Sequence, residues 1–64
     1  MTKRFTLQMT CDNDAFEAET DAEIVRILRE VANRIERGDS YSTFRNIHDA
    51  NGNIVGTFAL KEER

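Results

Sequence analysis

The side chains that stand out by type and spacing are six carboxylates between residues 12 and 23, a stretch without a basic residue. They make up half of the chain's 12 acidic residues: Asp12, Asp14, Glu17, Glu19, Asp21 and Glu23. Carboxylates so spaced could bind a metal ion, favour the positive end of a helix, or pair with the lysines and arginines of a partner. This stretch is therefore the main candidate site.

The spacing only partly resembles a calcium loop. Asp12, Asp14 and Glu23 fall at the first, third and last ligand positions of an EF-hand. However, Phe16 replaces an oxygen ligand, and Glu17 stands where that loop requires glycine. We therefore expect no metal here, and nothing else in the sequence indicates a cofactor.

Two interpretations of the carboxylates remain open. Asp21 and Glu23 suit the first turn of a helix, where the helix dipole favours negative charge. The other four precede that turn, and a solvated loop does not require a single sign of charge. A row of carboxylates can also occupy lysines and arginines that otherwise hold nucleic-acid phosphates, as a DNA mimic does. The second interpretation predicts that all six bind a basic protein surface.

Catalytic side chains are few. A nucleophile needs a neighbouring base and a third group that orients the base. The chain has one cysteine, Cys11, on the inward parity of an expected strand, and one histidine, His48, beside an expected turn. We therefore predict a protein that is not an enzyme.

Arginines provide an alternative binding function. Arg26, Arg29, Arg37 and Arg45 could contact phosphates, and the protein would then be a small nucleic-acid-binding accessory or regulatory protein, dimeric in one version of this hypothesis. The net charge of -3, a pI near 5.0 and the lack of tryptophan oppose it, because nucleic-acid-binding domains tend to be basic. The leading hypothesis involves no direct contact with nucleic acid.

The periodicity predicts a strand followed by a helix. Residues 5–11 alternate apolar and polar, with Phe5, Leu7, Met9 and Cys11 directed inward, and Phe16 anchors the acidic connection that follows. Residues 20–23 match a capping box in which the Thr20 hydroxyl and the Glu23 carboxylate satisfy backbone amides. The apolar stripe then predicts a helix over residues 21–37, ended by Gly38.

A hairpin is predicted from Tyr41 onward, with residues 49–53 as its turn. A three-residue loop with Gly52 in the left-handed conformation pairs Ile47 with Val55 and Phe44 with Phe58. This register directs Phe44, Ile54, Phe58 and Leu60 toward the core. It exposes Ile47 and Val55, near Tyr41, as an apolar interface for a partner or a second copy.

These elements give an α+β fold of the β-α-β-β type, with a three-stranded antiparallel sheet and one helix packed on one face. Residues 1–64 form a single domain, with the third strand between the other two. No apolar run reaches the roughly 20 residues that a membrane span needs, so we expect no membrane association and a cytoplasmic location. A domain this small and without crosslinks favours self-association or docking, and a homodimer is one such route.

Four segments together resemble short proteins encoded by bacteriophages and mobile elements: Asp12–Phe16, Glu23–Ala32, Glu36–Gly38 and Asp49–Gly56. The chain is also similar in size and character to anti-CRISPR inhibitors, several of which are acidic and act without catalysis. That resemblance implies an anti-defence protein in a bacterial host cell, whose partner is a protein or nucleoprotein complex with a basic surface.

Overall fold

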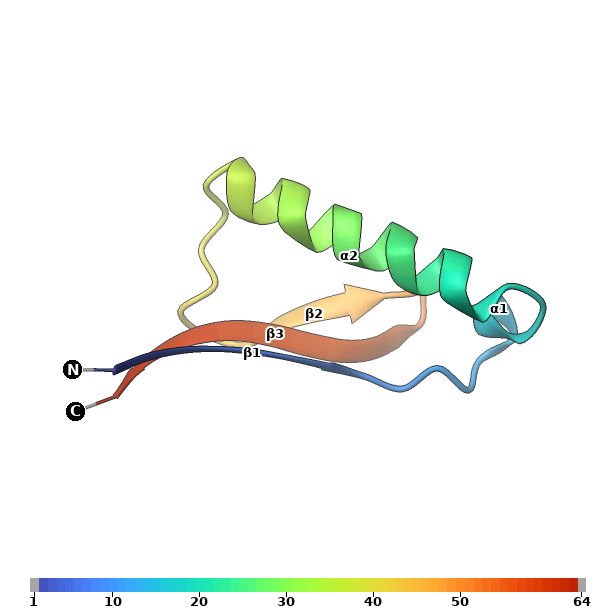
Figure 1. Cartoon of the computed structure of the whole chain (residues 1–64), viewed down its shortest axis with the longest axis horizontal. Helices are drawn as coiled ribbons and strands as arrows, with labels where there is room; N and C mark the ends of the chain where they lie inside the picture. Colours follow the sequence, from blue (N-terminus) through green and yellow to red (C-terminus); the bar gives the residue numbers. More distant parts are fainter. Residues whose placement is uncertain (1, 64) are drawn as a thin grey trace.

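The computed structural model describes residues 2–63. Its elements in chain order are β1 (Thr2–Met9), α1 (Asp14–Glu17), α2 (Thr20–Glu36), β2 (Arg45–His48) and β3 (Ile54–Glu63). The strands form one antiparallel sheet in the order β1-β3-β2, and α2 lies across one face of it (Figure 1). The predicted α+β fold and its strand order are therefore confirmed.

Strand β1 pairs with β3 over its whole length, from Thr2 opposite Glu63 to Met9 opposite Gly56. Leu7, Met9 and Cys11 pack against the core as their alternation predicted. Phe5 is on the same parity, but its side chain is 48% exposed. The inward face of β1 is therefore only partly covered.

Helix α2 agrees with the predicted range to within one residue at each end. Beyond its last turn, Gly38 has a φ of +89°, its amide donates to Ile35 O (3.0 Å), and the Asp39 amide donates to Arg34 O (3.1 Å). These two bonds form a Schellman motif, which needs a residue in the left-handed conformation at the position of Gly38. The predicted helix stop is confirmed.

The predicted capping box is wrong. The Thr20 hydroxyl donates to Phe16 O (2.5 Å), and Glu23 bonds to Arg26 and to the Ala50 amide instead of to the start of its own helix. The reason is α1, a helical turn in the stretch where the sequence predicts a loop. Because only two residues separate the end of α1 from the start of α2, the Phe16 carbonyl lies beside Thr20 and accepts its hydroxyl.

The turn of the hairpin has the predicted conformation. The Asp49 amide donates to Asn53 O (2.9 Å), and Gly52 has a φ of +85°. A three-residue loop with a left-handed glycine in its last position therefore joins β2 to β3.

The strand register beyond that turn differs from the prediction. His48 pairs with Ile54, but a β-bulge follows, so Ile47 pairs with Gly56 instead of with Val55. A bulge places two residues of one strand opposite one residue of the other and redirects the side chains. As a result, Ile47 and Val55 are only 2% and 6% exposed.

Of the four residues expected on the inward face, Phe58 and Leu60 are at least partly buried as predicted, but Phe44 and Ile54 are not. Phe58 is buried, whereas Phe44 and Ile54 are 56% and 61% exposed, and Arg45 takes the predicted place of Phe44 opposite Phe58. The proposed exposed interface of Ile47, Val55 and Tyr41 is therefore wrong in its two central residues.

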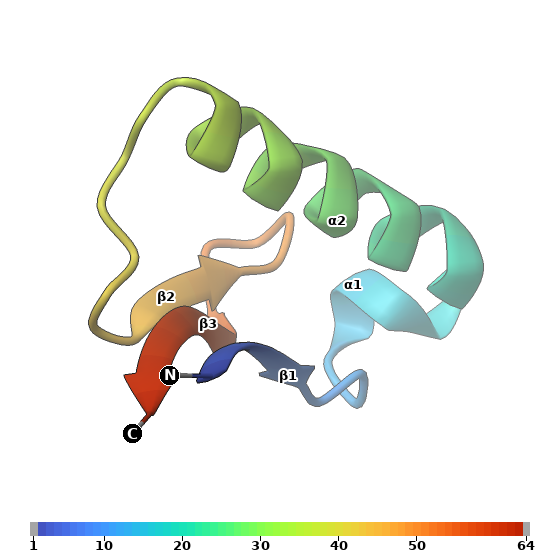
Figure 2. The ribbon, with the colours of Figure 1, turned by 60° about the vertical axis from the view of Figure 1, so that its left-hand side comes forward.

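The core is a single cluster between α2 and the sheet, joined by α1 from one end. Its buried members are Phe16, Ile27, Val31, Ile47, Val55 and Phe58. The molecule is long and thin, 42 × 22 × 17 Å, with the termini at one end and α1 at the other (Figures 1 and 2). The elements near the α1 end position the candidate site.

Candidate protein-docking surface

Five of the six predicted site carboxylates lie together at the α1 end of the molecule. We call this set the acidic lobe, and every member is exposed: Asp12, Asp14, Glu17, Glu19 and Asp21. The lobe comprises α1, the residues that flank it and the first turn of α2, far from the chain termini (Figure 1). The structure thus brings these five predicted residues onto one end of the molecule.

The backbone that carries the lobe is anchored to the domain at two points. The side chain of Phe16 is completely buried in the core. On the other side of α1, Asn13 Nδ2 donates to Asp49 Oδ2 in the hairpin turn (3.1 Å). An anchored backbone presents its side chains without the ordering cost that a free loop incurs on binding.

The lobe carboxylates form no ion pair with any other residue in the range 2–63. Within residues 2–63, each salt bridge joins other residues: Arg4–Glu63, Arg26–Glu23, Arg26–Glu30 and Arg37–Asp39. No described basic side chain therefore occupies the carboxylates of the lobe, and they remain available to a partner.

Glu23, the sixth predicted site residue, has a structural role. It is only 7% exposed, and Arg26 binds its carboxylate with two bonds, Nε to Oε1 (2.8 Å) and Nη2 to Oε2 (3.0 Å). Oε2 also accepts the Ala50 amide (2.8 Å), which ties α2 to the hairpin turn. The hydrogen bond from Arg26 lowers the pKa of Glu23. We therefore remove Glu23 from the candidate docking surface.

A second buried carboxylate, Asp49, was missed as a site residue. Its Oδ1 accepts the amides of Asn51 and Asn53 (both 2.9 Å), and its Oδ2 accepts the side-chain amide of Asn13. Burial alone raises the pKa of Asp49, but these hydrogen bonds outweigh it and the pKa is lowered. Asp side chains in turns often accept a hydrogen bond from the backbone amide two residues on, which could have indicated this role.

Two of the arginines assigned to the alternative function are already engaged. Arg26 contacts Glu30 (3.1 Å) as well as Glu23, and Arg37 contacts Asp39 (2.9 Å). A third arginine of α2, Arg34, donates to Asn46 O in β2 (3.0 Å) and lies 4.9 Å from the centre of the Phe58 ring. These contacts hold the helix on the hairpin.

The residues considered for catalysis are far from forming a site. Cys11 is half-buried against the core, and His48 is exposed on β2. Within residues 2–63, no group of three His, Cys, Asp or Glu side chains is placed to hold a metal ion. Tyr41, the third residue of the proposed apolar interface, is half-buried, with its ring 6.2 Å from the rings of both Phe5 and Phe58.

Comparison with known proteins adds no relative. No protein-family model, no curated protein and no solved structure matches the chain. In the part of the chain that the structure describes, no helix has the length and apolar character needed to cross a membrane.

Proposed function

We propose that this chain is a non-enzymatic anti-defence inhibitor, encoded by a phage or another mobile element, that acts in the cytoplasm of a bacterial host. It binds a basic, nucleic-acid-handling surface of a host protein complex through the acidic lobe. The observation that carries this proposal is the set of five exposed carboxylates on an anchored backbone, with no ion pair inside residues 2–63. We also propose that the chain self-associates through a surface other than the acidic lobe.

Electrostatics make such a lobe suitable for occupying a phosphate-binding groove. An ionised carboxylate can accept two parallel hydrogen bonds from an arginine, as a phosphate does, and these charge-assisted bonds are stronger than neutral ones. A patch of one sign also steers a partner of the opposite sign and accelerates association at low salt. Binding by this lobe would therefore block a basic groove without any chemical step.

Internal ion pairs weaken the alternative of nucleic-acid binding for two of its four arginines, although Arg29 and Arg45 are in none of the salt bridges within residues 2–63. Arg26 and Arg37 each lie within 3.1 Å of carboxylate oxygens of the same chain. Phosphates would have to displace these carboxylates, whereas the acidic lobe has no such competitor among the described residues.

Charge reversal in the lobe tests the proposal. We expect the triple variant Asp14→Lys, Glu17→Lys, Glu19→Lys to lose the bacterial proteins that the wild type retains in a pull-down from host lysate, and to lose inhibition of host defence. All three side chains are exposed, so the domain should stay folded. Circular dichroism of the purified variant checks that it does.

The matched control is Glu36→Lys, Glu62→Lys, Glu63→Lys. It makes the same change in net charge at exposed positions outside the lobe. We expect this control to retain the wild-type partners. If both triple variants lose them, net charge governs binding. If neither does, the lobe is only a solvated surface. Either result contradicts the proposal.

A further inference from the structure

The two edges of the sheet differ in how they are protected. Edge strand β2 has four residues and ends in a bulge, and both features hinder pairing with another strand. Edge strand β1 has eight residues in continuous register with β3, without proline or bulge. A long, regular edge of this kind is a template for a further strand.

Hydrogen bonds identify the backbone groups that β1 presents outward. The Thr10 amide donates to Val55 O (2.8 Å), and the groups that face a partner alternate along an antiparallel strand. The even-numbered residues of β1 therefore bond to β3, and the odd-numbered residues direct their N–H and C=O groups away from it. The pair of Phe5 and Leu60 fits this pattern. The Leu60 amide points away from β1 and donates to Tyr41 O on the β2 side, so it does not bond to Phe5.

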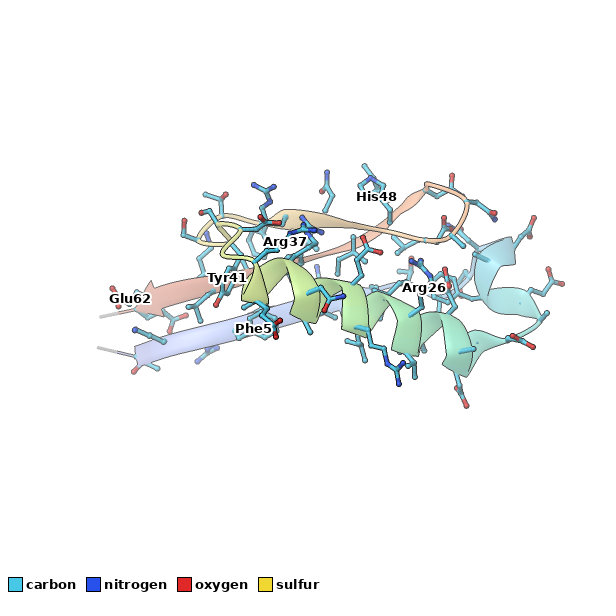
Figure 3. The ribbon with its side chains drawn as sticks, turned by 90° about the horizontal axis from the view of Figure 1, so that it is seen from above. Phe5, Arg26, Arg37, Tyr41, His48 and Glu62 are labelled. Carbon is cyan, nitrogen blue, oxygen red and sulfur yellow. The ribbon has the colours of Figure 1, made fainter. Side chains whose placement is uncertain are left out.

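An apolar flank lies above this edge. Arg26 and Arg34 reach β2 from one side of α2, and helical spacing places Leu28 on the other side, toward β1, with Val25 next to it and directed further out toward solvent. Leu28 and Val25 are 45% and 46% exposed. Viewed from above, Phe5 lies on the β1 side of the helix and Arg26 on the side of the hairpin (Figure 3).

The overall dimensions also indicate incomplete burial. The chain exposes 4761 Å², whereas a compact monomer of 7.4 kDa exposes about 4,200 Å². Its radius of gyration is 12.7 Å, against about 10.7 Å for a compact domain of this length. The excess surface favours an additional packing partner.

We propose that the partner at this edge is a second copy of the chain. The two β1 strands pair antiparallel about a twofold axis at Thr6 and form a continuous six-stranded sheet. Phe5 of one copy then lies opposite Leu7 of the other, beneath the Leu28 flank. On the far face, the two Thr6 side chains form a non-hydrogen-bonded pair, in which side chains approach most closely.

Charge is compatible with a second copy in this register and disfavours one alternative register. Lys3 and Arg4 are the charged residues of β1 and lie at its start, so antiparallel pairing places them opposite Met9 and Gln8 of the other copy. Moving the axis to Arg4 would place two arginines face to face, which is destabilising.

A charge-swap experiment tests the interface. We expect wild type to sediment with twice the mass of the 7.4 kDa chain. Thr6→Lys and Thr6→Glu place like charges across the axis, so each should weaken dimerisation about tenfold, whereas an equal mixture of the two should restore the dimer. Thr6 is exposed, so both variants should fold.

The control variant is Asn46→Lys, an exposed position on β2, which should dimerise like wild type. Hydrogen exchange provides a second readout: the amides of Lys3, Phe5, Leu7 and Met9 should exchange more slowly in wild type than in Thr6→Lys. A wild type that stays monomeric at millimolar concentration overturns the inference. It is also overturned if the mixture of Thr6→Lys and Thr6→Glu does not restore the dimer, or if Asn46→Lys is the only variant that disrupts it. These variants leave the acidic lobe unchanged, so failure here is distinguishable from failure of the proposed function.

Discussion

At the residue scale, Gly56 is the position where packing most strictly limits side-chain size. A Cβ added there would lie 2.0 Å from Gln8 O and 2.7 Å from the Met9 Cα, both in the backbone of β1. A backbone atom cannot move aside as the tip of a flexible side chain can. The close approach of β1 to β3 at this point therefore depends on glycine.

We predict that Gly56→Ala destabilises the domain by about 1–3 kcal/mol, the usual range for overpacking. Urea denaturation followed by circular dichroism measures this change as a lower midpoint. Thr57→Ala is the control, because it removes atoms from the neighbouring position of the same strand and adds none between the strands. Equal midpoints for Gly56→Ala and wild type would contradict this account.

At the element scale, two buried carboxylates join the segments at the α1 end. Glu23 connects α2 to the Ala50 amide of the hairpin turn, and Asp49 connects that turn to Asn13 before α1. Hydrogen bonds to the ionised forms lower the pKa of Glu23 from its ordinary 4.5 and that of Asp49 from 3.8. The two carboxylates therefore stabilise the fold more in their ionised form than in their protonated form.

The sign of the pH dependence follows from these lowered pKa values. A carboxyl group whose pKa is lower in the folded state contributes its full stability above the unfolded pKa and loses it as pH falls through the folded pKa. We predict that the contribution of these two groups is constant above about pH 5 and declines as the pH falls below their ordinary pKa values of 4.5 and 3.8. Urea denaturation at a series of pH values, for wild type and for Glu23→Gln, measures this. Because Gln cannot ionise, a decline as steep in the variant as in wild type would refute the role of Glu23.

Local sequence signals predicted the helices and strands, whereas the structure departs from the prediction where contacts between distant residues decide it. Gly38 and Gly52 mark a helix end and a turn through their own backbone preference, so both features could be read from the sequence. The bulge beside Val55 could not, because no local turn or helix signal in the sequence marks it. The acidic lobe was predicted from charge alone, but the burial of Glu23 depends on Ala50, 27 residues away.

At the scale of the whole molecule, a 64-residue chain with excess exposed surface should be marginally stable as a monomer. If the fold is completed by β1 pairing, unfolding also separates two chains, so mass action raises the thermal midpoint with protein concentration. We predict a rise of about 3–5 °C per tenfold increase for wild type. Thr6→Lys should show a smaller rise, because its like charges weaken the pairing. Differential scanning fluorimetry over several concentrations measures both slopes, and a wild-type midpoint that does not change with concentration would mean that the monomer is the complete folding unit.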